Sequence, residues 1–224
     1  TYCVIPSIRG AYRSVPMEQI LKEAEKLAQD GVKELILVAQ ETTLYGVDLY
    51  GKKMLPELLE RLSAIEGIYW IRLQYCYPEE ITEELIHTMA TNSKICHYID
   101  IPIQHANDDI LKRMGRKTSQ ADIRHIVASL REAMPDICIR TTLICGFPGE
   151  TVEAHEELKT FVADMTFDRL GSFAYSRQEG TPADTFPDQI AEELKQTRVA
   201  EIMELQQDIS AACNETYIGR TLDA

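Results

Sequence analysis

Apolar residues along this chain recur with two periods, and the two periods alternate from the first residues to the last. Stretches with an apolar residue at every third or fourth position predict amphipathic helices, and short, nearly all-apolar runs predict buried strands. The predicted helices span residues 17–29, 55–64, 82–90, 118–133, 151–165 and about 190–212. The predicted strands span residues 34–39, 70–74, 98–103, 137–145 and 170–175. Strands and helices therefore alternate, and a helix comes first.

Residues at the helix ends agree with this assignment. Thr82 and Thr118 stand where N-caps are expected, and Pro56 suits the first turn of its helix. Gly31 follows the first predicted helix and is expected to close it.

This order of elements predicts an α/β fold in which a parallel sheet is covered by helices. Because the series opens on a helix, we infer that one strand precedes the chain. Six βα units are fewer than the eight of a closed barrel, so we expect a partial, TIM-like (βα)6 barrel. A doubly wound open sheet is the alternative, since the number of strands does not exclude it.

Composition limits the classes of protein that fit. A chain of 224 residues with 45% hydrophobic residues suits one globular domain. There is no apolar run of about 18 residues, as a membrane span would need, and no signal-peptide pattern. Six scattered cysteines are typical of a reduced, cytoplasmic protein. The net charge of −13 argues against nucleic acid binding by this domain alone and is compatible with a basic partner.

Polar residues gather directly after each predicted strand. In parallel α/β folds, binding and catalytic groups lie at the carboxyl ends of strands, so we expect several of these loops to converge on one mouth. A structural role stays open for single residues: His105 could cap the following helix, and Glu41 could be solvated. The loops are Gln40-Glu41-Thr42, Tyr75-Cys76-Tyr77-Pro78, Gln104-His105, Gly146-Phe147-Pro148-Gly149-Glu150 and Ser176-Arg177-Gln178-Glu179-Gly180.

The loop after the fourth predicted strand has the pattern of a ligand-binding turn. Gly146 and Gly149 flank Phe147 and allow a tight turn with close approach of a ligand. Thr151 is expected to begin a helix whose free N–H groups favour polar or anionic groups. Such a turn could receive the adenine and ribose of a nucleoside. A plain strand-to-helix turn is the alternative.

Cys3 lies on a short loop ahead of the first predicted helix. A single cysteine is more often structural than functional, so its role depends on the rest of the chain. The five later cysteines show no ligand spacing and are expected to be small buried hydrophobes. Cys138 and Cys145 lie in one strand but seven residues apart, which places them on opposite faces and prevents their pairing.

Three segments together resemble the radical S-adenosylmethionine (SAM) core of the methylthiotransferases. They are Tyr2-Cys3, Leu143–Glu150 and Ala174–Ala183. That family combines an N-terminal domain carrying a second cluster, a radical SAM partial barrel and a small C-terminal β domain called TRAM. The resemblance implies that residues 1–224 are the radical SAM core alone, without the two flanking domains.

The resemblance implies a 4Fe–4S cluster held by the three cysteines of a Cys-x-x-x-Cys-x-x-Cys loop. Cys3 matches the third cysteine, and the other two are expected upstream of Thr1. In this family the cluster passes an electron to SAM, and the 5′-deoxyadenosyl radical then removes hydrogen from an unactivated carbon. A second 4Fe–4S cluster, in the N-terminal domain, helps to install sulfur and methyl. An electron donor protein is an implied partner, and residues 1–224 alone are expected to be inactive.

The resemblance also implies which residues bind SAM. Tyr2 is expected beside the adenine, with Gly146 and Phe147 bordering it. Arg140 is expected to bind the SAM carboxylate, because a guanidinium fits a carboxylate with two hydrogen bonds; a surface charge is the alternative. The expected cofactor-binding residues are Tyr2, Gln40, Gln104, Arg140, Gly146, Phe147 and Ser176, with Cys3 as the metal ligand.

Three further segments favour one branch of that family, whose members modify an aspartate of small-subunit ribosomal protein S-twelve. They are Leu73–Pro78, Ile99–His105 and Phe167–Gly171. The alternative is the branch that modifies tRNA adenosines, which carries Pro-x-Gln-Ser-Gly where this chain has Pro102-Ile-Gln-His-Ala106.

Two hypotheses outside the family stay open. One is a cluster-free barrel enzyme of the aldolase or isomerase type, in which Glu41 or His105 acts as general base. The other is a scaffold surface without a catalytic role.

Overall fold

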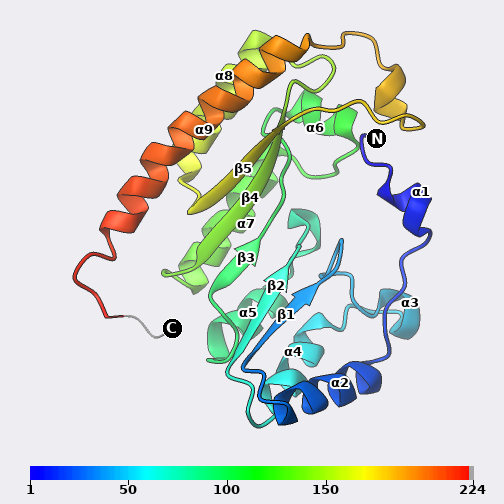
Figure 1. The fold of residues 1–224 in the computed structure, drawn as a ribbon, viewed down its shortest axis with the longest axis vertical. Helices are drawn as coiled ribbons and strands as arrows, with labels where there is room; N and C mark the ends of the chain where they lie inside the picture. The colour runs from blue at the N-terminus through cyan, green and yellow to red at the C-terminus, as the bar shows by residue number, and fades with distance from the viewer. Residues whose placement is uncertain (222–224) are drawn as a thin grey trace. The chain divides into compact units, whose positions relative to one another are not determined.

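The computed structural model describes residues 1–221, and over these residues it is an α/β structure with five strands (Figure 1). It divides into two compact units, which are described in turn. Unit 1 comprises Thr1–Val4, Ile103–Gln120 and Ile139–Ala224. Unit 2 comprises Ile5–Pro102 and Ala121–Cys138. Within residues 1–221, no helix combines the length and apolar character needed to cross a membrane.

Unit 2 contains the first three strands. β1 (Glu34–Val38) and β2 (Trp70–Gln74) are parallel and pair along their whole length, and β3 (Tyr98–Asp100) packs beside β2. The helices of this unit are α1 (Ile5–Arg9), α2 (Met17–Gln29), α3 (Val47–Tyr50), α4 (Leu55–Ser63), the short 3-10 helix η1 (Pro78–Glu80), α5 (Glu83–Thr91) and, from Ala121 onward, α7 (Gln120–Ala133).

The core of unit 2 forms where α4 packs against α5 and β2. Leucines three and four residues apart give α4 one apolar face, so Leu59 and Leu62 become fully buried. Ile71 and Leu73 of β2 are also fully buried, because alternate residues of a strand face the same side.

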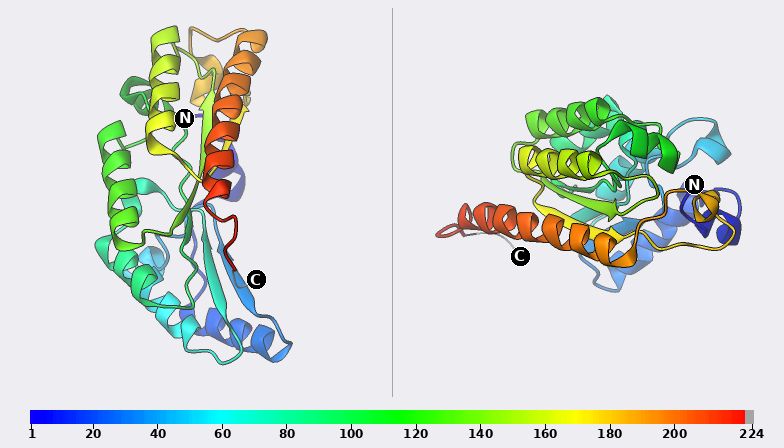
Figure 2. Two further views of the ribbon diagram at one scale, coloured as in Figure 1. Left: turned by 90° about the vertical axis from the view of Figure 1, so that its left-hand side faces the viewer. Right: turned by 90° about the horizontal axis from the view of Figure 1, so that it is seen from above.

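Unit 1 contains β4 (Cys138–Cys145) from Ile139 onward and β5 (Arg169–Ala174), which are parallel. Gln104 forms an isolated parallel bridge with Leu143 of β4. The helices are α6 (Asp108–Met114), α8 (Val152–Met165), the 3-10 helix η2 (Pro182–Thr185) and α9 (Glu192–Glu215). α9 packs along β5 and against α8 (Figure 2).

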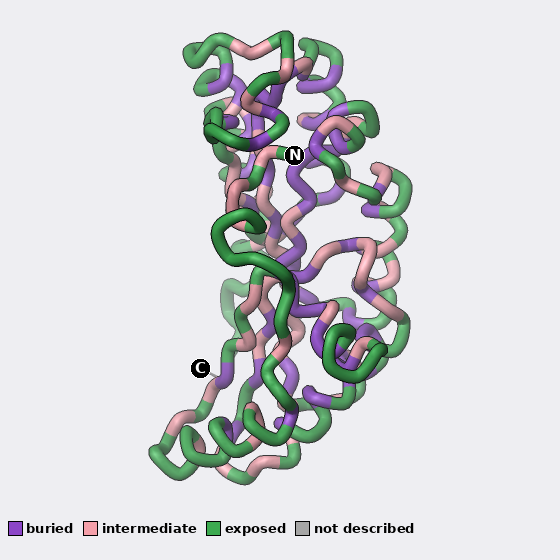
Figure 3. Tube along the Cα trace, turned by 90° about the vertical axis from the view of Figure 1, so that its right-hand side faces the viewer, coloured by how far each residue is buried: buried purple, intermediate pink, exposed green. Residues whose placement is uncertain are grey.

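Buried residues lie on helices as well as on strands (Figure 3), and burial along β2 and β4 follows the alternation expected for a sheet. Every second residue of β4 is buried, from Ile139 to Cys145. Cys145 is buried whereas Cys138 is half-buried, so the two cysteines do lie on opposite faces, and neither forms a disulfide.

Several elements differ from the sequence-based assignment. The loop after Cys3 contains α1, and α6 lies where no helix was predicted. α6 has an Asn107 N-cap and ends at Gly115 in the left-handed conformation, but seven residues are too few to show a helical period. β3 has three residues instead of six because the chain leaves strand geometry after Asp100. α7 begins at Gln120, whose N–H donates to the Asp108 carboxylate at 2.7 Å.

We expect Thr151→Ala to lower the free energy of unfolding by about 1 kcal/mol, because the Thr151 hydroxyl caps α8 by accepting the Ala154 N–H. Urea unfolding measures this difference. Thr160→Ala is the matched control, since Thr160 lies in the same helix, is exposed and only bonds the Glu156 carbonyl one turn before it. Equal losses in the two variants would contradict the capping role.

Candidate functional site

The turn that follows β4 lies in an aromatic cluster of unit 1. Residues 146–150 are called the glycine turn here. Phe147 is fully buried, and its ring meets Tyr175 edge to face at 5.2 Å between centroids. Phe186 lies at 6.2 Å and Tyr2 at 6.5 Å, both nearly perpendicular to Phe147. The structure thus brings together Tyr2 and Phe147, which are separate in sequence and were both predicted to bind the cofactor.

The segment that carries Cys3 is anchored at the residues before it. The Thr1 nitrogen donates to the Met114 carbonyl at 3.0 Å, and the Thr1 hydroxyl donates to the Arg113 carbonyl at 2.8 Å. The Ala183 N–H in turn donates to the Thr1 carbonyl at 3.1 Å. Thr1 and Tyr2 are therefore held between the end of α6 and η2, and the thiol of Cys3 beyond them is exposed.

An exposed thiol on an anchored backbone fits the role of a metal ligand, because the ligand atom is accessible and its position is constrained. Among residues 1–221, no group of three or more His, Cys, Asp or Glu side chains is arranged to hold a metal ion. Cys3 can therefore supply one ligand of a cluster but does not form a site with the other described residues.

The carboxylate of Glu150 sits at the centre of the glycine turn and is 2% exposed. One oxygen accepts the Gly146 N–H at 2.6 Å and the Phe147 N–H at 3.3 Å. The other accepts from Arg198 of α9 at 3.0 Å, and the Nδ1 atom of His155 lies 3.4 Å from it. Burial alone would raise the pKa of Glu150, but the His105 and His155 imidazoles and the Arg198 guanidinium outweigh it and lower the pKa to about 2.

His105 is an interior residue rather than an accessible base. It is fully buried, and its Nδ1 accepts the Asn107 N–H at 2.9 Å. That bond places the ring proton on Nε2, which lies 3.6 Å from the Glu150 carboxylate. His105 therefore connects the start of α6 to the glycine turn, and Asn107, not His105, caps the helix. This arrangement does not favour the general-base role for His105.

Both glycines of the turn have positive φ, at 74° for Gly146 and 86° for Gly149, so the predicted tight turn is present. The space beside their α-carbons is filled. A Cβ on Gly146 would lie 2.3 Å from Cγ of Lys195, and one on Gly149 would lie 2.7 Å from the Arg113 guanidinium. At these α-carbons the close neighbours are side chains of α9 and α6. Gly149 also lines a groove of about 440 Å³ together with residues of α6 and α8.

Three other predicted site residues occupy different places. Gln104 is next to β4: its N–H donates to the Thr142 carbonyl and its carbonyl accepts the Ile144 N–H. Its φ of 73° is in the left-handed region, which is unfavourable for a residue with a side chain. Ser176 is exposed and follows Tyr175 directly. Gln40 belongs to unit 2, where it is exposed beyond the end of β1.

Arg140 lies near the start of β4, six residues before Gly146, and stands beside Arg169 at the start of β5. There it lines a groove of about 510 Å³ together with α9. Six residues of a strand span about 20 Å, so the structure does not bring Arg140 to the glycine turn. Its predicted contact with the SAM carboxylate stays a prediction, and the geometry does not favour it.

In unit 2, Glu41 lies in the loop after β1 and is buried, at 5% exposure. Its carboxylate accepts the Thr43 N–H at 2.7 Å and the Tyr77 N–H at 2.9 Å, and it also accepts from the Thr43 hydroxyl. Burial raises the pKa of Glu41, and the backbone hydrogen bonds offset only part of that effect, so the pKa is about 7. The carboxylate thus connects the loops after two strands and is not solvated.

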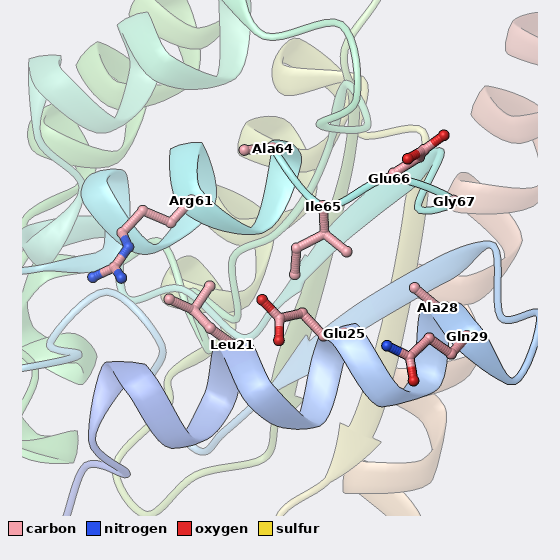
Figure 4. Close-up of a pocket in the computed structure, with 9 residues that line it drawn as sticks. All are labelled: Leu21, Glu25, Ala28, Gln29, Arg61, Ala64, Ile65, Glu66 and Gly67. Atoms are coloured by element: carbon pink, nitrogen blue, oxygen red, sulfur yellow. The ribbon is translucent and has the colours of Figure 1, made fainter.

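A groove of about 640 Å³ lies in unit 2 between α2 and the end of α4. Figure 4 shows Leu21 and Glu25 of α2 facing Arg61 and Ile65 across it. None of the predicted site residues lines this groove, so its size does not identify the site.

Comparison with known proteins assigns the class. The sequence profile of the radical SAM superfamily matches residues 1–162 of this chain. The chain belongs to the radical SAM superfamily.

The most similar curated proteins narrow the class. The chain is 61% identical over 222 residues to a protein of Lachnoclostridium phytofermentans named ribosomal protein uS12 methylthiotransferase RimO. It is 55% identical over 223 residues to a protein of the same name from Clostridium botulinum. These matches cover 99% and 100% of the chain but 50% of each relative. The chain spans about half the length of the curated relatives it matches.

Solved structures confirm the fold class. The radical SAM methyltransferase TsrM from Kitasatospora setae, solved with cobalamin and a 4Fe–4S cluster, superimposes with a TM-score of 0.59 at 19% identity. That match covers 75% of this chain and 33% of TsrM. Methylornithine synthase PylB superimposes with a TM-score of 0.58 at 16% identity, covering 87% of this chain and 54% of PylB. The α/β fold is therefore that of radical SAM enzymes, as predicted.

Sequence reasoning missed three residues that hold the glycine turn. Lys195, Arg198 and His155 all lie on helices and are buried. The sequence offers no distinguishing signal for them, because charged residues on a helix ordinarily face solvent. Their contacts with the turn appear only when α8 and α9 are packed.

We expect Gly146→Ala to destabilise the chain by about 3 kcal/mol or more, because it combines a positive φ with a clash against Lys195. Gly180→Ala is the control: Gly180 has a φ of 81° but nothing within 4 Å of its missing Cβ, so we expect about 1 kcal/mol. Chemical unfolding measures both. Adding Lys195→Ala to Gly146→Ala should recover part of the difference, and strict additivity in this cycle would contradict the close contact.

We expect Glu41 to make stability fall as pH rises. Its folded-state pKa of about 7 is above its ordinary value of 4.5, so between these values the folded protein retains a proton that the unfolded chain has lost. Ionising the buried carboxylate then costs stability. Unfolding experiments from pH 4.5 to 8 should show wild type losing stability relative to Glu41→Gln. A difference between the two that does not change with pH would show that folding does not raise the pKa of Glu41.

Proposed function

We propose that this chain is the radical SAM core of a methylthiotransferase that acts on an aspartate of small-subunit ribosomal protein S-twelve. The observation that carries the proposal is 61% identity over 99% of the chain to a protein named for that activity. A relationship so close and continuous supports a shared site as well as a shared fold. Because the chain spans about half of that relative, the activity belongs to a longer protein that includes this core.

We further propose that Cys3 is one of three thiolate ligands of a 4Fe–4S cluster, with the other two cysteines outside residues 1–224. The exposed thiol and the anchored backbone of Thr1 and Tyr2 support this role. Cysteine thiolates are the usual ligands of such clusters. With SAM bound, the cluster supplies the radical chemistry needed to break an unactivated C–H bond, which no side chain of the protein performs.

The residues of unit 1 bind and orient the cofactor in this proposal. Tyr2 precedes the cluster ligand and packs against Phe147, so the adenine is expected along this aromatic pair. The Gly146 and Phe147 N–H groups already donate to Glu150. They are therefore unavailable to SAM, and the turn contributes shape and aromatic contact at this point rather than N–H donors. Ser176, Gln104 and Gln40 stay proposed cofactor contacts.

The remaining parts of the proposal concern the longer protein. A second 4Fe–4S cluster in an N-terminal domain and an electron donor protein are its expected cofactor and partner. Net charge of −13 suits a basic ribosomal protein, since opposite charges accelerate encounter and fix orientation. A ribosomal substrate also places the reaction in the cytoplasm.

Deleting the gene should remove the methylthio group from the aspartate of the ribosomal protein and leave tRNA adenosines unchanged. Mass spectrometry of both substrates measures this. Complementation with the full-length gene should restore the modification, whereas the Cys3→Ala gene should not, because the cluster would lose a ligand. The Cys213→Ala gene is the matched control, since Cys213 lies on α9 away from the Tyr2-Cys3 segment.

Two outcomes would contradict this proposal. If deletion removed the methylthio group from tRNA and left the ribosomal protein unchanged, the substrate would be that of the tRNA branch. If Cys3→Ala complemented as well as wild type, Cys3 would not be a cluster ligand.

A further inference from the structure

Helix α9 places two cationic side chains inside unit 1. Lys195 is 6% exposed and Arg198 is 4% exposed. The carboxylates of the same helix are exposed or half-buried, from Glu192 to Glu215. Long cationic residues are almost never fully buried unless they are paired. The groups that Lys195 and Arg198 contact inside unit 1 therefore explain why their side chains are buried.

Arg198 holds both the main chain and the side chain of Glu150. Its Nη1 donates to the Glu150 carbonyl at 2.9 Å and to the carboxylate at 3.0 Å. The second carboxylate oxygen accepts the N–H groups of Gly146 and Phe147. A continuous chain of hydrogen bonds therefore runs from α9 through one carboxylate to the first two residues of the glycine turn.

Lys195 holds the neighbouring strand end. Its Nζ donates to the Tyr175 carbonyl at 3.0 Å, at the end of β5, while its Cβ and Cγ cover the α-carbon of Gly146. Lys195 and Arg198 are three residues apart and so share one face of α9. That face contacts the ends of both β4 and β5, which precede the glycine turn and Ser176.

The interaction between Arg198 and Glu150 is ionic at neutral pH, because the pKa of Glu150 is about 2. A buried ion pair adds little net stability compared with an apolar pair of similar volume, whereas removing one partner alone leaves an uncompensated buried charge. Its main effect is on geometry, because hydrogen bonds between a guanidinium and a carboxylate fix the relative orientation of the two groups.

We propose that Arg198 and Lys195 are positioning residues for the SAM-binding turn, so that the affinity for SAM depends on helix α9. The inference rests on the proposed function, in which Gly146 and Phe147 border the cofactor. Neither cation needs to touch SAM. They act through Glu150 and the Tyr175 carbonyl, which fix the backbone on which the cofactor rests.

The test uses the full-length protein under anaerobic conditions with its clusters reconstituted. Iron content, thermal midpoint, SAM affinity by equilibrium dialysis and the SAM-induced change in the electron paramagnetic resonance signal of the reduced cluster are measured for each variant. We expect Arg198→Met to retain wild-type iron content while binding SAM about tenfold more weakly. Arg198→Lys should recover part of this affinity, because an ammonium can still donate to Glu150.

Lys159→Met is the matched control. It also removes one positive charge from the packed pair of α8 and α9, but Lys159 pairs with the partly exposed Glu156 and Glu201 and makes no contact with the glycine turn. Its SAM affinity and spectroscopic change should equal those of wild type. If Arg198→Met does not fold, Arg198→Lys decides: weaker SAM binding at full iron content supports the inference, and unchanged binding overturns it.

The possible outcomes separate the two proposals. If wild type binds SAM and Arg198→Met binds it equally well, the positioning role is wrong and the proposed function stands. A loss of iron, stability and SAM affinity in parallel also overturns the positioning role, since it would show a general structural effect. If the wild-type protein binds neither iron nor SAM, the proposed function fails and this inference fails with it.

Discussion

The carboxylate of Glu150 is the interaction on which the arrangement of unit 1 depends. It accepts the first two N–H groups of the glycine turn, it pairs with Arg198 of α9, and the rings of His105 and His155 face it. Such a buried charge is unfavourable unless its partners surround it. The requirement to satisfy it therefore brings the end of β4, the start of α6, and helices α8 and α9 to one point.

This constraint gives the residues around the turn separate roles. The N–H groups of Gly146 and Phe147 are used internally, so the turn presents shape and an aromatic neighbour on the Tyr2 side. Cys3 follows Tyr2 directly, and its backbone is set by the hydrogen bonds of Thr1 to the end of α6. The glycine turn and the thiol segment are thus held by different contacts within the same unit.

The net charge of the chain and the buried charges of unit 1 have different effects. Overall the chain is acidic, at −13, which suits a basic partner approaching from solution. Inside unit 1, the buried charges of Glu150 and Arg198 are balanced. The surface charge bears on the proposed encounter with a basic substrate, whereas the interior pair bears on backbone geometry. Because the chain spans about half the length of the curated relatives, the proposed recognition of that substrate belongs to the longer protein.

The sequence by itself determined the elements whose signals are local. α2 matches its predicted bounds, Met17–Gln29, because an apolar stripe repeated over about three and a half turns is followed directly by a closing glycine. Three segments together, Tyr2-Cys3, Leu143–Glu150 and Ala174–Ala183, likewise indicated the family, which the superfamily match and the 61% identity to a methylthiotransferase confirmed. Only the tertiary structure decided the interior of the site. Arg198 and Glu150 are 48 residues apart, and nothing near Arg198 in the sequence distinguishes it from a solvated charge. The burial of a charge depends on which distant segments pack around it, and that packing is not a local property of the chain.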